Sequence, residues 1–514
     1  MRLALAVLVL PLLAAAPAAA SPVLPDGTYR YEMRIGGTSI GTSTIVIRRR
    51  DDAIEITESA AIAGRTLAST RFVDARTFAT RSYEVQADGN RFTMSIAGND
   101  ATLTHAGSSV TIASPAGVRF LVSDNTAAGF ALMPATFAAT GSKELTLACV
   151  CGSFVAVPVT LTASARGSAT ISVQGQTATL RFDPASDVLY ELDLPAQNLA
   201  LVLQSHDSGT AAPPAAVVPT PLLLPSPNYA ARQVTIVADD GVKLAGTLTL
   251  PNAAATRFPA LLLVHGSGCN DRDETIGPNK IFAQIANRLS NDGYAALRYD
   301  KRSCGRSGGT FPVRQRLIAD ARNALAFLRS QPGIDPKRIY VLGHSEGGEL
   351  APSIAIEDRH LRGIVLLAPP ARPLEQILMQ QLLRNAEAQQ RPVIVRAEQA
   401  AFEAIRTGKR NSAEARWLRS SFGIDPATLI ARVPCAILIL QGTKDIQVLP
   451  ADTPRLVRAA QRAHRDLTVV MLAGDDHLFI NLPAAAASSA GEYFVPSYLD
   501  PAMFAAMEQW LTHH

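Results

Sequence analysis

Ser345 lies at the centre of the pentapeptide Gly-His-Ser-Glu-Gly (residues 343–347), whose residue types and spacing suit covalent chemistry. A short apolar run rich in β-forming residues (339–342) precedes it, and a segment able to start a helix follows it. A Gly-x-Ser-x-Gly sequence between a strand and a helix is typical of a nucleophile elbow. The glycines are needed because a Cβ at Gly343 or Gly347 would collide with the neighbouring strand or helix on such a tight turn. A plain Gly- and Ser-rich loop is the alternative interpretation.

A serine hydroxyl is a poor nucleophile at neutral pH, so it needs a base, an acid that orients the base, and donors for the oxyanion. When such a serine sits on an elbow, the acid and then the histidine follow it along the chain, each in a loop after a strand. Asp445 directly follows a predicted buried strand (436–440) and is the candidate acid. His477 follows the last predicted strand (467–472) and is the candidate base.

Other titratable residues near these positions have structural interpretations. Asp475 and Asp476 are too close to His477 in sequence to orient its ring, and one of them is expected to cap or hydrogen-bond the loop. His464 is expected at the surface end of a helix.

The donors for the oxyanion are expected to be two backbone amides. One is the N–H of Glu346, the residue after the serine, and the other is the N–H of Ser267 in the Gly-rich segment 265–269. Substrate contacts are assigned to His265, Gly266 and His344, and for the His344 side chain, which points away from the serine oxygen, packing is the other interpretation. No metal ion or organic cofactor is expected, because no His, Cys or Asp cluster has the spacing of metal ligands.

Length and composition indicate two globular domains. The 514 residues exceed the size at which a single core stops growing, and the chain is 47% hydrophobic and 18% charged. The formal net charge is only +4 and the basic residues are scattered, so nucleic acid is not an expected partner.

The N-terminus has the pattern of a secretory signal peptide. Arg2 provides the positive charge, an apolar run (3–16) follows, and three alanines at 18–20 precede Ser21. We therefore expect cleavage after Ala20 and a periplasmic or secreted protein. The run is too short and too rich in alanine for a stable membrane anchor.

Residues 21–206 alternate apolar and polar residues in short runs separated by glycine-containing turns, for example at 92–96 and 180–182. This pattern predicts an all-β domain, as an antiparallel sheet, barrel or sandwich. Its role is open between capture of lipid or substrate, dimerisation and shielding of a site. The Pro- and Ala-rich stretch 207–230 predicts an extended linker.

From residue 231 to the C-terminus at 514, strand and helix patterns alternate, which predicts an α/β domain with a doubly wound, mostly parallel sheet. Segments 234–236 and 244–250 predict a pair of antiparallel strands that precedes the parallel strands. A long helical segment at about 372–432 interrupts the rhythm. In a hydrolase such an insertion would lie over the site as a cap, and helical packing without substrate contact is the alternative.

Three segments together resemble bacterial carboxylesterases of the α/β-hydrolase fold, in particular the exported type with an N-terminal β domain. They are residues 262–273 (with Leu-Leu-Val-His-Gly-Ser-Gly), 298–302 (Arg-Tyr-Asp-Lys-Arg) and 343–348. The resemblance covers residues 233 to 514 and implies a serine esterase for small to medium acyl esters. It also implies that Ser345, Asp445 and His477 form the triad. One departure is the Ser303-Cys304 pair before Gly305, where such esterases usually have a glycine directly after the arginine.

Serine aminopeptidases, prolyl-oligopeptidase-like peptidases and acyl thioesterases share much of this pattern. A non-catalytic binding protein on the same fold is a further alternative. The sequence does not predict the oligomeric state.

Cys269 and Cys304 end neighbouring strands if the usual strand order holds. We hypothesise that they form a disulfide that holds the oxyanion loop, and two free thiols are the alternative.

Overall fold

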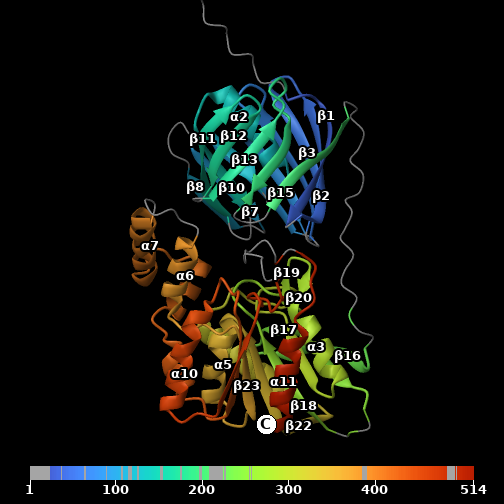
Figure 1. Cartoon of the computed structure of the whole chain (residues 1–514), viewed down its shortest axis with the longest axis vertical. Helices are drawn as coiled ribbons and strands as arrows, with labels where there is room; N and C mark the ends of the chain where they lie inside the picture. Colours follow the sequence, from blue (N-terminus) through green and yellow to red (C-terminus); the bar gives the residue numbers. More distant parts are fainter. Residues whose placement is uncertain are drawn as a thin grey trace, which may run out of the picture.

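A computed structural model shows two domains, one all-β and one α/β (Figure 1). It describes residues 24–514 except 36, 63–64, 88–89, 106–107, 114–118, 124–126, 151–153, 174–175, 196–198, 208–223, 225–226, 254, 256, 385–390, 483–492 and 494. The predicted signal peptide (1–20) and most of the predicted linker (207–230) lie outside the described residues. The last strand of the first domain ends at Asp207, and the first strand of the second begins at Tyr229.

The N-terminal domain is one sheet of 15 strands, in which β1 and β15 pair at the centre and the order runs outward to β8 on one side and β9 on the other. Neighbouring strands of this sheet are antiparallel, except that β9 pairs in parallel with β10. The strands are β1 (Gly27–Ile35), β2 (Thr38–Arg49), β3 (Ala53–Ile62), β4 (Arg65–Asp74), β5 (Thr80–Ala87), β6 (Asn90–Ala97), β7 (Asp100–His105), β8 (Ser108–Ala113), β9 (Arg119–Ser123), β10 (Glu144–Val150), β11 (Phe154–Ala165), β12 (Ser168–Val173), β13 (Gln176–Phe182), β14 (Leu189–Leu194) and β15 (Leu199–Asp207).

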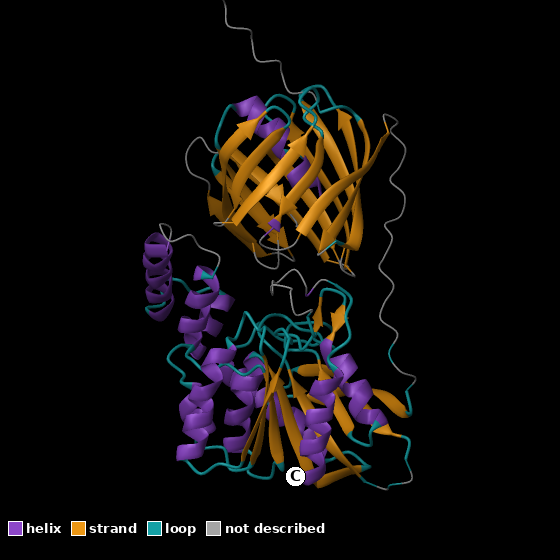
Figure 2. Ribbon diagram, in the orientation of Figure 1, coloured by secondary structure: helices purple, strands orange, loops and turns teal. Residues whose placement is uncertain are grey.

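The sheet is strongly curved and wraps around two helices, α1 (Ala127–Ala131) and α2 (Met133–Thr140), as Figure 2 shows. Buried residues of both helices and of both halves of the sheet form one apolar core. The strand prediction is therefore confirmed for most of this domain. It is wrong for residues 127–140, because a helix enclosed by a sheet is apolar on nearly all sides and has no alternation to reveal it.

The C-terminal domain is built on an eight-stranded sheet with the order β16-β17-β21-β18-β22-β23-β24-β25. β16 and β17 are antiparallel, as predicted, and the strands from β21 to β25 are parallel. The strands are β16 (Tyr229–Val237), β17 (Lys243–Pro251), β18 (Phe258–Val264), β21 (Ala295–Tyr299), β22 (Ile334–His344), β23 (Gly363–Leu367), β24 (Ala436–Gly442) and β25 (Leu467–Leu472).

Helices cover both faces of this sheet, so its strands are apolar on both sides, as parallel strands require. The helices are α3 (Ile281–Asn291), α4 (Arg314–Arg329), α5 (Glu346–Glu357), α10 (Thr453–Arg462) and α11 (Pro501–His513). α4, α5 and α10 contribute to the core on one face, and α3 and α11 to the core on the other. The carboxyl ends of the parallel strands meet at one edge, and this edge carries the site.

The predicted helical insertion (372–432, called the cap below) contains α6 (Leu374–Leu383), α7 (Arg391–Arg406), α8 (Ala413–Ser421) and α9 (Pro426–Ile430). Ser412 begins α8 by accepting a hydrogen bond from the N–H of Ala415, and Asp425 begins α9 in the same way. Among the described residues, no helix has both the length and the apolar character needed to cross a membrane.

The two domains touch through the segment around residue 495. Asn279, in the short hairpin of β19 (Thr275–Ile276) and β20 (Asn279–Lys280), donates hydrogen bonds to the carbonyls of Tyr493 and Val495, both at 2.9 Å. The Val495 side chain packs against the core of the β domain. In Figure 1 this hairpin faces the β domain from the strand-end side of the α/β sheet. The β domain therefore lies on the side of the molecule that carries the site.

Candidate active site

Ser345 occupies a strained turn between β22 and α5. Its φ is 52°, in the left-handed region that residues with a side chain rarely adopt. The glycines on either side permit this turn: a Cβ on Gly343 would lie 2.1 Å from the Gly347 carbonyl oxygen, and a Cβ on Gly347 would lie 2.0 Å from that of Val264. The predicted strand–turn–helix context is present, and it holds the serine at the end of a buried strand.

Asp445 and His477 meet beside this turn. Nδ1 of His477 lies 2.8 Å from Oδ2 of Asp445, and both side chains are buried. Because a carboxylate only accepts, Nδ1 carries the proton and donates, which leaves Nε2 as the basic nitrogen. The geometry therefore brings together the acid and the base that the sequence indicates.

Asp445 is held by more than the histidine. It accepts hydrogen bonds from the side chain of Gln441 (3.0 Å) and from the backbone N–H groups of Gln447 (2.8 Å) and Val448 (2.9 Å). Burial alone would raise the pKa of Asp445, but His477 and these backbone donors hold it below its usual value. The acid is therefore fixed in position and kept charged.

The loop that carries His477 is supported by Asp476, whose Oδ1 accepts hydrogen bonds from the N–H groups of Leu478 (2.8 Å) and Ile480 (3.0 Å). The interpretation that one of the two neighbouring aspartates hydrogen-bonds this loop is confirmed. Gly442 lets the loop approach closely, since a Cβ there would lie 2.4 Å from the Asp475 carbonyl oxygen.

His344 lies beneath the triad with only 1% of its surface exposed. Its Nε2 lies 3.0 Å from the carbonyl oxygen of His477, and its Nδ1 lies 3.1 Å from Oε1 of Glu274. Both neighbours are acceptors, so both ring nitrogens donate and the ring is an imidazolium. Burial would lower the pKa of His344, but Glu274 and the carbonyl outweigh it and raise the pKa. The pKa of Glu274 is lowered by His344 against its own burial.

The side chains assigned to substrate contact on sequence grounds, His265 and His344, are both buried. His265 packs between the rings of Phe282 and Tyr299, and burial lowers its pKa to about 4. In this structure His265 packs in the core, and His344 supports the backbone of His477. Substrate contact by these two residues stays a prediction, and for His344 the packing interpretation fits its surroundings.

Gly266 brings the oxyanion loop next to the nucleophile, because a Cβ on Gly266 would lie 3.2 Å from Cβ of Ser345. Its N–H donates to Oε1 of Glu274 at 2.5 Å, and its carbonyl accepts from the side chains of Asn270 (2.8 Å) and Lys301 (2.6 Å). The backbone that carries the predicted donor of Ser267 is thus held on both sides of Gly266.

A disulfide joins Cys269 to Cys304, with the two Cα atoms 5.4 Å apart, as hypothesised. A second link is close by, where the guanidinium of Arg272 contacts both oxygens of Asp300 (2.9 and 2.7 Å). The disulfide and this ion pair therefore tie the oxyanion loop to the loop after β21, in addition to the contact of Lys301 with Gly266. The turn at Ser303 departs from the usual pattern and is accommodated by a positive φ of 65°.

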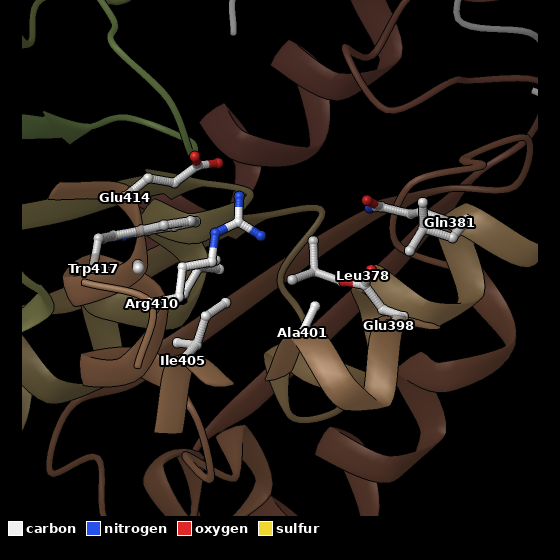
Figure 3. A pocket seen from close by; sticks show the side chains of 11 residues that line it. Leu378, Gln381, Glu398, Ala401, Ile405, Arg410, Glu414 and Trp417 are labelled. Carbon is white, nitrogen blue, oxygen red and sulfur yellow. The ribbon is translucent and has the colours of Figure 1, made fainter. Parts of the chain in front are cut away.

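The cap contributes one direct contact to the elbow. Nε1 of Trp417, in α8, donates to Oε1 of Glu346 at 2.7 Å. Trp417 also lines a cavity of about 420 Å³ between α6, α7 and α8. Figure 3 shows Trp417 and Glu414 on one side of this cavity and Leu378 and Gln381 on the other, with the guanidinium of Arg410 between them.

Sequence reasoning assigned no role to four residues that the structure places in this network: Glu274, Lys301, Trp417 and Gln441. Of these four, only Lys301 belongs to a sequence motif that could have pointed to it, the Asp-Lys-Arg segment. Within the described part of the chain, no group of three or more His, Cys, Asp or Glu side chains is arranged to hold a metal ion.

Comparisons with known proteins agree with this architecture. Residues 261–489 match the sequence profile of a family described as the Alpha/beta hydrolase family. The chain is 33% identical to the esterase EstD of Thermotoga maritima over 279 residues, which cover 52% of this chain and 65% of that protein. It is 34% identical to the thiohydrolase aneE of Aspergillus aculeatus over 166 residues, covering 30% of this chain and 48% of the relative. The chain thus spans less than two thirds of either relative.

A crystal structure of the Pyrococcus furiosus esterase Pf2001 superposes with a TM-score of 0.37 and 17% identity, over 51% of this chain and 89% of that one.

Proposed function

Given that residues 261–489 form an Alpha/beta hydrolase family domain, we propose that the protein is a serine hydrolase that cleaves carboxylic esters through an acyl-enzyme. The observation that carries the proposal is the contact of His477 Nδ1 with Asp445 at 2.8 Å, in loops beside the strained turn of Ser345. The 33% identity to an esterase supports ester hydrolysis as the reaction.

In the proposed mechanism, Nε2 of His477 takes the proton of the Ser345 hydroxyl as its oxygen attacks the acyl carbon. Asp445 holds the ring in the required tautomer and stabilises the imidazolium that forms. The N–H groups of Glu346 and Ser267 donate to the oxyanion of the tetrahedral intermediate. His477 then protonates the leaving alcohol, and a water molecule activated by the same nitrogen releases the acid.

The cap supports a preference for small to medium acyl chains. Its cavity of about 420 Å³ is lined by apolar side chains of α6, α7 and α8 together with polar and charged ones such as Arg410 and Glu398, and it is adjacent to the elbow through Trp417. Pockets for small molecules commonly have 300–1,000 Å³. We propose that the acyl chain or the alcohol of the ester lies in this cavity.

A thioester is the second candidate substrate class, because one of the relatives is a thiohydrolase. The proposed mechanism would act on a thioester with the same residues, since only the leaving group differs.

The test is hydrolysis of p-nitrophenyl esters from acetate to laurate, beside an acyl thioester and an aminoacyl anilide, by wild type and Ser345→Ala. Loss of the serine should lower kcat on the order of a million-fold. Ester turnover that peaks at one chain length and disappears in the variant would support the proposal. Faster thioester or anilide turnover would change the substrate class, and equal feeble rates in both proteins would contradict a role for Ser345.

A further inference from the structure

Lys301 is a buried cation that the proposed mechanism does not use. It directly follows Asp300 after β21, and 4% of its surface is exposed. Its Nζ donates to the carbonyl oxygen of Gly266 at 2.6 Å and lies 3.0 Å from Oε2 of Glu346. One ammonium group therefore contacts the oxyanion loop and the elbow at the same time.

The contact with Gly266 acts on the amide of Ser267. The carbonyl of Gly266 and the N–H of Ser267 belong to one planar trans peptide group, in which they point in opposite directions. A cation held on the carbonyl fixes the direction of the N–H and draws electron density away from it, because hydrogen bonds along a chain of dipoles strengthen one another at low dielectric. Lys301 thus makes this amide a better-aimed and stronger donor.

The contact with Glu346 acts on the second amide. Glu346 is the residue whose own N–H is the other predicted donor, and its side chain is held from both ends. Oε2 lies against Lys301, and Oε1 accepts the indole N–H of Trp417 at 2.7 Å. The elbow residue is therefore connected to the cap through the hydrogen bond from Trp417, and its ion pair is with the same ammonium group that contacts the oxyanion loop at Gly266.

We propose that Lys301 is the positioning residue of the oxyanion hole, and that Trp417 couples the cap to this hole through Glu346. The inference rests on the proposed serine hydrolase function and adds to it a regulation of the same site. Since Trp417 also lines the cap cavity, the indole that would border the substrate is the group that helps to orient Glu346 (Figure 3).

A purely structural ion pair is the competing explanation, and the next residue provides a matched control. Arg302 is equally buried at 4% exposure and pairs with Asp320 and Asp240. It shares the loop and the burial of Lys301, but its guanidinium donates to Asp320 and Asp240 instead of Gly266 and Glu346. Lys301→Met and Arg302→Met therefore separate the loss of a buried charge from the loss of the oxyanion contact.

Three quantities are measured for wild type and both variants: kcat and KM for p-nitrophenyl butyrate, and the inhibition constant of a butyl trifluoromethyl ketone, which forms a tetrahedral adduct. Removing a direct oxyanion donor costs on the order of 100- to 1,000-fold in kcat. A residue that acts behind the donor should cost less, so Lys301→Met should lower kcat roughly 10- to 100-fold. KM should stay within about twofold, and the ketone should bind more weakly by the same factor as the fall in kcat/KM.

Lys301→Met leaves the carboxylate of Glu346 buried, so it is paired with the double variant Lys301→Met/Glu346→Gln, which removes both charges and keeps an acceptor for Trp417. The double variant should also be slow. Arg302→Met should lose thermal stability with a smaller fall in kcat than Lys301→Met.

Trp417→Phe removes the indole N–H and reduces the size of the ring, but keeps an aromatic side chain at the cavity. It should lower kcat about threefold in wild type, in line with the loss of one hydrogen bond to a charged group that retains its other partner. In the Lys301→Met background it should have little further effect, because residues that act through a common partner are not additive.

The outcomes distinguish failure of the proposed hydrolase function from failure of the roles assigned to Lys301 and Trp417. A wild type without Ser345-dependent turnover overturns the proposed function and the inference with it. An active wild type in which Lys301→Met changes kcat no more than Arg302→Met, or changes KM instead of kcat, overturns the role of Lys301. Equal effects of Trp417→Phe in both backgrounds overturn the coupling to the cap.

Discussion

Both domains bury ion pairs, but at different places in their sheets. In the β domain Glu58 and Arg71, both with fully buried side chains, lie on the adjacent strands β3 and β4. Glu58 also accepts from the hydroxyl of Ser43 and, at 3.3 Å, from the N–H of Ala128 in α1. This pair fastens the sheet to the helix that it encloses.

In the α/β domain the corresponding pairs, Glu274 with His344 and Lys301 with Glu346, lie at and beyond the ends of the strands, around Ser345. They hold the backbone of the base, the elbow and the oxyanion loop. A buried pair thus serves stability when it lies along neighbouring strands, as Glu58 and Arg71 do, and serves chemistry when it lies past the strand ends and also contacts the backbone of the site, as Glu274–His344 and Lys301–Glu346 do. The two kinds of pair should therefore respond differently to mutation.

After loss of the serine itself, the largest effect is expected from the acid of the triad. Asp445→Asn should lower kcat by about 10⁴-fold, because an amide can donate to Nδ1 and favour the wrong tautomer of His477. The fold should persist, since the amide oxygen can still accept from the backbone N–H groups of Gln447 and Val448. Turnover and circular dichroism on the same samples check this, and a variant that keeps a tenth of the activity would contradict the assignment.

A contrasting effect is expected in the β domain. Glu58→Gln removes the negative charge that pairs with the fully buried guanidinium of Arg71, and breaking such a pair typically costs about 3–5 kcal/mol. The free energy of unfolding of this domain should fall by that order, while kcat at 25 °C should change little. Urea unfolding beside turnover measures both quantities.

Glu274→Gln is the matched variant for the α/β domain. Here kcat should fall together with stability, because Glu274 orients the ring of His344, which donates to the carbonyl of His477. If Glu58→Gln and Glu274→Gln gave the same ratio of stability loss to activity loss, the distinction between the two kinds of pair would be wrong.

The disulfide provides a smaller effect. Cys269 and Cys304 are 35 residues apart, and closing a loop of this size contributes roughly 3–4 kcal/mol in the chain-entropy account. Reduction should lower the free energy of unfolding of the α/β domain by that order and slow turnover, because the oxyanion loop loses its covalent tie to the loop after β21.

The control for reduction is Cys269→Ser/Cys304→Ser, in which the reductant should have no further effect. Alkylation of both cysteines in the unreduced wild type would show that the bond is not formed.

The last effect is a pH dependence of stability and concerns Asp475, a buried neighbour of the base. Burial, followed by the nearby carboxylates of Asp500 and Asp476, raises its pKa to about 7, while Asn481 donates to it at 2.9 Å. The folded protein therefore holds this proton more tightly than the unfolded chain. The free energy of unfolding should fall as pH rises from about 4 to about 7 and then level off with respect to this group.

Asp475→Asn should remove this fall, so the variant should gain stability relative to wild type as pH rises through that window. The raised pKa of His344 adds a separate loss above pH 6.5 that both proteins share. Thermal unfolding of both proteins from pH 4.5 to 8 isolates the difference, and two parallel curves would contradict the shift.

Much of the α/β domain could be predicted from the sequence because its buried parallel strands are short apolar runs with polar ends. The last strand, 467–472, was predicted at its observed bounds. The triad candidates followed from the order of Ser345, Asp445 and His477 along the chain. The helices at 127–140 could not be predicted, because an enclosed helix shows no amphipathic period.

The supporting partners of the site were also beyond sequence reasoning. Glu274 meets His344 across 70 residues, and Trp417 meets Glu346 across 71. Such contacts arise only when loops from different strands gather at one edge of a sheet, and no local spacing encodes them.

The central claim is that Ser345 is the nucleophile, and covalent labelling tests it most directly. Wild type and Ser345→Ala would be treated with a biotinylated fluorophosphonate, which reacts with activated serines, and the adduct located by tandem mass spectrometry. The account predicts one adduct, on Ser345, that is absent from the variant and forms far more slowly in Asp445→Asn. An adduct on another residue, or a folded wild type that is not labelled, would contradict it.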